Sequence, residues 1–154
     1  MSPESATRRF HLLASLSGSA YDHAKLAEAE HLRSAALLLA ERRDLIPDSD
    51  AIPFLRAMIK DARTTGMSAL AAQAFHTLIA RVESLDEPDI DWLAQMNFSL
   101  AMTLTTGGLP GAETPMARAI EILKAKPDAL GDDLVARLAN AYSDLLSSEG
   151  RDAE

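Results

Sequence analysis

The 154-residue chain contains no cysteine, only seven glycines and few aromatic residues, which make up 5% of the sequence. The absence of cysteine excludes a disulfide scaffold, a thiolate metal site and a cysteine nucleophile. No glycine-rich phosphate loop, dinucleotide fingerprint or Gly-x-Ser-x-Gly elbow occurs in the sequence. We therefore expect a protein that holds no cofactor and is not an enzyme.

Acidic residues outnumber basic ones by 23 to 15, which gives a net charge of −8. This balance argues against binding to nucleic acid, because a protein that binds a phosphate backbone needs a cationic surface. The charge is uneven: the chain through Gly66 has nine basic and nine acidic residues, and the remainder has six and fourteen. An acidic half is explained either by solubility or by a partner of complementary charge.

No uncharged run is suited to crossing a membrane. The longest, Trp92 to Ala112, contains several polar residues, and its helical part is expected to end near Gly107 after about 15 residues, or about 22 Å, against the roughly 30 Å of a bilayer core. The segment 7–13 is similar to a twin-arginine export signal, but serines and a glycine interrupt the apolar stretch that follows. We expect a cytoplasmic protein with no membrane contact.

Alanine and leucine together supply about a third of the residues, and no segment alternates apolar and polar residues as a strand would. The sequence predicts a single all-α domain over residues 1–154. Its expected parts are helical hairpins at about 3–44, 50–85 and 88–126 and a final helix at 129–148. Within the first hairpin, the first helix is expected to end at Gly18, and a Ser19-x-x-Asp22 capping box begins the second. A helical bundle is the alternative architecture.

An internal repeat favours stacked hairpins over a bundle. An offset of 45 residues aligns alanines on the expected second helices, for example Ala27, Ala72 and Ala117. Small side chains at these positions allow close approach between neighbouring helices, as stacked hairpins require.

Three local patterns carry a family resemblance. They are Gly66 followed by Ala71 and Phe75, the string Leu100-Ala101-x-x-Leu104-x-x-x-Gly108, and the string Leu138-Ala139-Asn140-Ala141-Tyr142. Over residues 50 to 148 the chain resembles tetratricopeptide repeats. The resemblance implies a right-handed stack of antiparallel hairpins that binds a protein or peptide and performs no chemistry.

The chain departs from that family in three respects. Its spacing is near 45 residues where the family uses 34, segment 109–114 is an insertion, and no glycine lies four residues after Tyr142. A longer two-helix repeat of the HEAT type fits the spacing better and the residues less well.

The resemblance places the first helix of each hairpin on a concave surface, where a partner groove is expected. On the third helix, Arg56, Lys60 and Arg63 fall within about 60° of one another beside an apolar face. On the fifth helix, Phe98 and Met102 lie outside the main apolar face, so each is either part of the core or offered to a ligand. The expected partner-binding residues are Arg56, Lys60, Arg63, Gln95, Phe98, Met102, Arg137 and Asn140. A solvated cationic face and a buried Phe98 and Met102 are the alternative interpretation.

These residues predict a protein- or peptide-binding module with an adaptor or regulatory role. One alternative is an acidic regulator that occupies a basic site on another protein through Asp86, Glu87, Asp89, Asp91, Asp132 and Asp133. Another is a metal-binding helical bundle, suggested by Glu28-x-x-His31. No second Glu-x-x-His occurs, so we expect no metal site. Self-association is a further possibility, because the ends of a helical stack expose apolar faces.

Overall fold

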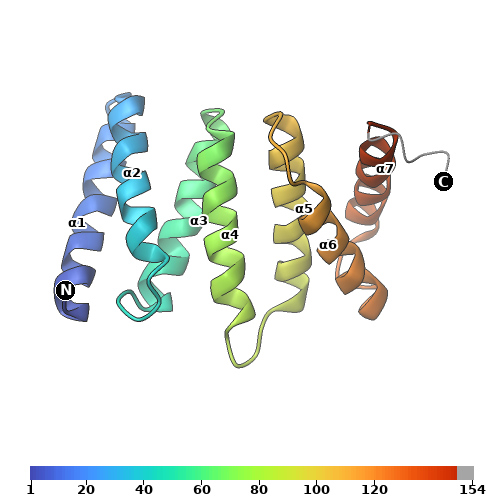
Figure 1. Ribbon diagram of the computed structural model, residues 1–154, viewed down its shortest axis with the longest axis horizontal. Helices are drawn as coiled ribbons and strands as arrows, with labels where there is room; N and C mark the ends of the chain where they lie inside the picture. Colours follow the sequence, from blue (N-terminus) through green and yellow to red (C-terminus); the bar gives the residue numbers. More distant parts are fainter. Residues whose placement is uncertain (149–154) are drawn as a thin grey trace. The chain divides into compact units, whose positions relative to one another are not determined.

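In the computed structural model, which describes residues 1–148, these residues form seven α-helices and no strand (Figure 1). The helices are α1 (Pro3–Asp22), α2 (Leu26–Ala40), α3 (Asp48–Thr64), α4 (Ser68–Glu83), α5 (Ile90–Thr106), α6 (Glu113–Ala125) and α7 (Asp132–Ser148). Consecutive helices pack as the hairpins α1/α2, α3/α4 and α5/α6. The predicted all-α class and its helical hairpins are confirmed.

Contacts divide the chain into two compact units, residues 1–81 and the residues from 82 onward. The boundary falls near the end of α4, so unit 1 holds α1 to α3 and most of α4, and unit 2 holds α5 to α7. The single domain expected from the sequence stays a prediction.

The first helices of successive hairpins are spaced regularly along the chain. Helices α3, α5 and α7 begin at Asp48, Ile90 and Asp132, which are 42 residues apart, and each has 17 residues. The offset of 45 was predicted from alanines of the second helices, and α2, α4 and α6 begin at Leu26, Ser68 and Glu113, which are 42 and 45 residues apart. The two offsets differ by three residues, which is close to one helical turn, so both align residues of the same helical face.

The ends of α1, α3 and α5 repeat at the same spacing. Each helix is followed by a residue in the left-handed region: Ala24 with φ 57°, Gly66 with φ 73° and Gly108 with φ 65°. After each, the next N–H donates to the carbonyl five residues back, as Lys25 N does to Ala20 O at 2.8 Å. These are Schellman motifs, which satisfy carbonyls that the end of a helix leaves unpaired.

The predicted boundary between the first two helices is wrong. Helix α1 continues through Gly18 to Asp22, and α2 begins at Leu26, not at Ser19. A glycine within a helix costs only about 1 kcal/mol, and the continued helix buries Ala20. The actual end lacks the usual signal, because its left-handed residue is Ala24 and not a glycine.

In unit 1 the first helices pack against each other as well as against their hairpin partners. The rings of Phe10 in α1 and Phe54 in α3 meet edge to face with centroids 4.9 Å apart. The hydroxyl of Thr7 donates to the carbonyl of Leu45, just before α3, at 3.3 Å. These contacts fix which side of α3 faces α1.

In unit 2, α5 is the central helix, with nine buried residues. It begins at Ile90, and the side chain of Asp89 caps it by accepting from the N–H of Trp92 at 3.0 Å. By contrast, Leu138 is the one buried residue of α7. The two helices therefore differ in how far their apolar faces are covered.

Candidate functional site

The three cationic residues predicted on the third helix share an exposed face of α3. Arg56, Lys60 and Arg63 are all exposed, while Leu55 and Ile59 on the other face are buried. Within residues 1–148, the side chains of Lys60 and Arg63 take part in none of the ion pairs. The exposure expected for this cationic stripe, defined as Arg56, Lys60 and Arg63, is present in the structure.

The acidic residues of α3 all interact with other helices of unit 1. The pairs are Asp48 with Arg81 at 2.7 Å, Asp50 with His11 at 3.2 Å and Asp61 with Arg33 at 2.6 Å. Each carboxylate lies at least partly within the unit, with no more than 35% of its side chain exposed. Helix α3 therefore directs its negative charges toward its neighbours and leaves the cationic stripe on the solvent side.

The candidate residues of unit 2 fall into two groups. Gln95, Arg137 and Asn140 are exposed and Met102 is half-exposed, so these four can contact a partner. Phe98 is only 3% exposed, and the interpretation that offered it to a ligand is wrong for this structure.

The structure brings two of the predicted residues together. The guanidinium carbon of Arg137 in α7 lies 5.9 Å from the centroid of the Phe98 ring in α5, within the range of a cation–π contact. Arg137 therefore covers Phe98 and also presents its outer side to solvent. The cationic stripe belongs to unit 1 and these residues to unit 2, so a single groove that combines them stays a prediction.

Two buried arginines of unit 1 were missed by sequence reasoning. Arg81 is 1% exposed and Arg33 is 3% exposed. Arg33 lies 4.6 Å above the ring of Tyr21 and pairs with Asp61, and Arg81 joins α4 to α2 and α3. The one signal for them in the sequence is a cation flanked by apolar residues on a helix, as in the segment 78–82. This signal is weak, because a long cationic side chain at such a position usually extends its charged end to solvent.

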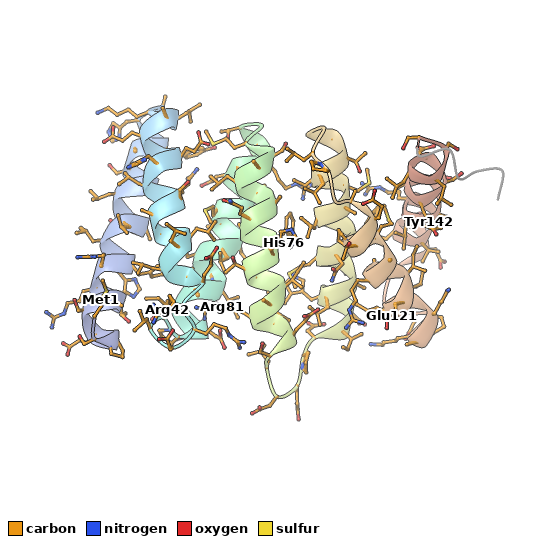
Figure 2. All side chains as sticks on the ribbon, in the orientation of Figure 1. Met1, Arg42, His76, Arg81, Glu121 and Tyr142 are labelled. Atoms are coloured by element: carbon orange, nitrogen blue, oxygen red, sulfur yellow. The ribbon has the colours of Figure 1, made fainter. Side chains whose placement is uncertain are left out.

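Unit 1 also has two hollows. One, of about 350 Å³, lies between α1 and α2 and is lined by Leu16, His23 and Leu32 among others. The other, of about 240 Å³, lies between the end of α2 and α4, where Figure 2 labels His76 and Arg81. The buried guanidinium of Arg81 already binds Ala40 and Asp48, so it is engaged by the protein itself.

Neither a metal centre nor a membrane span is found among residues 1–148. No three histidine or carboxylate side chains of this part of the chain come together as metal ligands would, and Glu28 and His31 are both exposed. In the same residues, no helix combines the length and apolar character that a bilayer crossing needs.

Comparison of the chain with protein-family models, with curated proteins and with solved structures finds no match. The resemblance to tetratricopeptide repeats therefore rests on the residue patterns alone. Two of these patterns coincide with structural features: Gly66 and Gly108 adopt the left-handed turn that ends a first helix, and Ala71 and Phe75 are buried in α4.

Proposed function

We propose that this protein is a protein- or peptide-binding module, with no chemistry of its own, whose unit 1 contacts an acidic segment of its partner. The observation that supports this is the division of charge on α3. Its acidic residues are engaged by Arg33, Arg81 and His11, and its cationic stripe faces solvent. A cationic surface on a helix favours a partner of complementary charge and speeds its association.

A peptide with an acidic segment and apolar residues at helical spacing suits such a surface, because helix-in-groove recognition combines apolar anchors with charged contacts at the edge. In unit 2, the half-exposed Met102 supplies an apolar contact, and the exposed outer side of Arg137 supplies a cationic one. These are secondary contacts in the proposal, since Phe98 is buried.

The test compares three forms of the full chain in binding to a library of defined peptides, measured by fluorescence anisotropy. The first is wild type, and the second carries Arg56→Glu, Lys60→Glu and Arg63→Glu. The control carries Lys25→Glu, Arg42→Glu and Lys124→Glu, three exposed cations outside the stripe that change the net charge equally. We expect acidic peptides to bind wild type and the control, and to lose at least tenfold in affinity for the stripe variant.

Equal losses in both variants would show that only the net charge matters and would refute the stripe as a site. Circular dichroism shows whether each variant keeps its helices. All six positions are solvent-exposed, so we expect no change in helix content.

An acidic regulator that occupies a basic site on another protein is the second candidate. It is supported by the exposure of Asp86, Glu87, Asp132 and Asp133. The other two residues of this predicted surface are engaged within unit 2: Asp89 caps α5, and Asp91 pairs with Lys126 at 2.6 Å. Binding of basic peptides that is lost on neutralising the four exposed carboxylates, with the stripe variant unaffected, would favour this candidate.

A further inference from the structure

Helix α7 carries an apolar stripe that its own unit does not cover. Val135, Ala139 and Tyr142 follow Asp132 at intervals of three, four and three residues, so these four side chains form one line along the helix, here named the α7 stripe. None of the four is buried, and Tyr142 is 40% exposed.

The same positions of α3 and α5 are buried. Counted in steps of 42 residues, the three apolar members of the α7 stripe correspond to residues 51, 55 and 58 of α3 and to residues 93, 97 and 100 of α5. All six of those side chains are buried. The α7 stripe is therefore of the kind that α3 and α5 bury in their packing, and in α7 it is open.

Helix α1 carries a second open stripe. Leu12, Leu16 and Ser19 follow Arg9 with the same three, four and three spacing, and we name these four residues the α1 stripe. Leu12 is 60% exposed and Leu16 is 46% exposed. The residue of α3 that corresponds to Leu12 is Phe54, which packs on Phe10 of the preceding first helix. Leu12 therefore lies on the side through which a first helix contacts the one before it.

The two stripes carry opposite charges, and a hollow lies beside the α1 stripe. Each has a charged residue one turn before its apolar residues, positive in α1 (Arg9) and negative in α7 (Asp132), so a parallel pairing in register sets the opposite charges side by side. Such a pairing places Leu12 on Val135 and Leu16 on Ala139. The hollow of about 350 Å³ beside Leu16, with Ser19 and His23 in its lining, gives room for an aromatic ring with a hydroxyl such as that of Tyr142.

We propose that the α1 stripe of one copy of this chain binds the α7 stripe of a second copy. The partner is thus the protein itself, and the contact is heterologous, because two different surfaces meet and each copy retains one of each. The contact extends over about three helical turns, so the interface is small and the association is weak, with a Kd in the micromolar range or above.

The test uses the full chain and two blocked variants. The α1-blocked variant carries Leu12→Glu and Leu16→Glu, and the α7-blocked variant carries Ala139→Glu and Tyr142→Glu. All four side chains are exposed, so both variants are expected to fold, and circular dichroism checks this. The control is Leu38→Glu, which replaces a leucine of α2 that is 66% exposed and lies outside both stripes.

Sedimentation velocity over a range of concentrations measures assembly. We expect wild type and the Leu38→Glu control to associate increasingly with concentration, and each blocked variant alone to remain monomeric. A mixture of the two blocked variants retains one intact stripe of each kind, so it should form a 1:1 complex and nothing larger. The proposal fails if wild type is monomeric throughout, as it would be if another protein covers these faces, or if the mixture does not associate.

Charge reversal tests the register of the pairing separately. Arg9→Glu in the α7-blocked variant should weaken its complex with the α1-blocked variant about tenfold, and Asp132→Lys in the α1-blocked variant should restore the affinity to within about threefold. If Arg9→Glu and Asp132→Lys together weakened the complex by the product of their separate effects, with no recovery of affinity, the parallel register would be contradicted. None of these substitutions touches the cationic stripe of α3, so the outcome is independent of the function proposed for that stripe, and only Asp132→Lys changes a carboxylate of the second candidate.

Discussion

Arg81 of α4 donates two hydrogen bonds to the carbonyl oxygen of Ala40, the last residue of α2, from Nε at 2.9 Å and from Nη2 at 2.6 Å. Its Nη1 donates to Asp48 in the first turn of α3 at 2.7 Å. One buried cation thus satisfies the end of one helix and pairs with the start of the next. The last carbonyls of a helix have no partner within the helix, so this contact replaces solvent at a buried helix end.

Replacing Arg81 should therefore destabilise unit 1 strongly. We expect Arg81→Ala to lower the free energy of unfolding by about 3 kcal/mol, because Ala40 O and Asp48 lose their partner inside the protein. Urea denaturation followed by circular dichroism measures this. The control is Arg42→Ala, which removes an exposed pair with Asp44. Arg81→Ala should lower the urea concentration at the midpoint of unfolding clearly more than Arg42→Ala does. Equal midpoints for the two variants would contradict the role given to Arg81.

The turn after α1 offers a stabilising substitution. Ala24 occupies the left-handed position that Gly66 and Gly108 occupy after α3 and α5. A side chain is strained in this region, so Ala24→Gly should raise the free energy of unfolding by roughly 0.5–1 kcal/mol.

The matched reverse change is Gly66→Ala, which should lower the same free energy by about 1 kcal/mol. An added Cβ at Gly66 meets no atom within 4 Å, so the backbone conformation alone is responsible for the expected loss. If Ala24→Gly and Gly66→Ala changed the free energy of unfolding in the same direction, the assignment of strain to Ala24 would be refuted.

Lys126 should titrate above its ordinary range. Its hydrogen bond to Asp91 is the main cause that raises its pKa above 10.5, and partial desolvation opposes the rise. A raised pKa in the folded state means that the stabilisation is fully present below pH 10.5 and is lost as the pH rises through the higher value. NMR titration of the lysine side chains should show the pKa of Lys126 falling toward 10.5 in Asp91→Asn.

The control for that titration is Asp128→Asn. Asp128 acts on Lys126 only through a weaker charge interaction, so its replacement should lower the pKa of Lys126 less than Asp91→Asn does. The reverse order would show that the hydrogen bond is not the main cause.

Phe98 should behave as a core residue. We expect Phe98→Ala to cost about 3–4 kcal/mol of unfolding free energy, because the ring is buried and the substitution leaves a cavity. Met102→Ala, at a half-exposed position on the same helix, should cost about 1 kcal/mol. Thermal denaturation of both variants tests whether Phe98→Ala loses more stability than Met102→Ala. A loss at Phe98 as small as that at Met102 would instead support the interpretation that Phe98 is exposed to a ligand.

Much of the architecture is predictable from local patterns. The apolar periodicity and the scarcity of strand-forming patterns give the all-α class, and Gly66 and Gly108 mark the ends of two first helices because glycine adopts the left-handed turn without strain. The same reasoning fails at Ala24, where the turn is made by a residue that carries no such signal. It also places a boundary at Gly18, which the burial of Ala20 overrides.

The candidate surfaces show a similar division. Helical periodicity is enough to place Arg56, Lys60 and Arg63 on one face of α3. It cannot distinguish them from Arg33 and Arg81, which are buried, because all five are cations on amphipathic helices. What differs is burial, which local periodicity does not reveal: Arg33 and Arg81 are buried where a carboxylate or a helix end of another element accepts from the guanidinium, and these partners lie 28 to 41 positions away in the chain.

The residue order of this chain is sufficient to make helices, to set their amphipathic faces and to concentrate negative charge after Gly66, because these properties depend on neighbours within a few residues. Which faces remain uncovered depends on packing between distant segments. Leu12 and Leu138 lie at corresponding positions of α1 and α7, yet the first is 60% exposed and the second only 2% exposed. Burial of that kind is a property of the three-dimensional contacts, and it is these contacts that leave the stripes of α1 and α7 open to a partner.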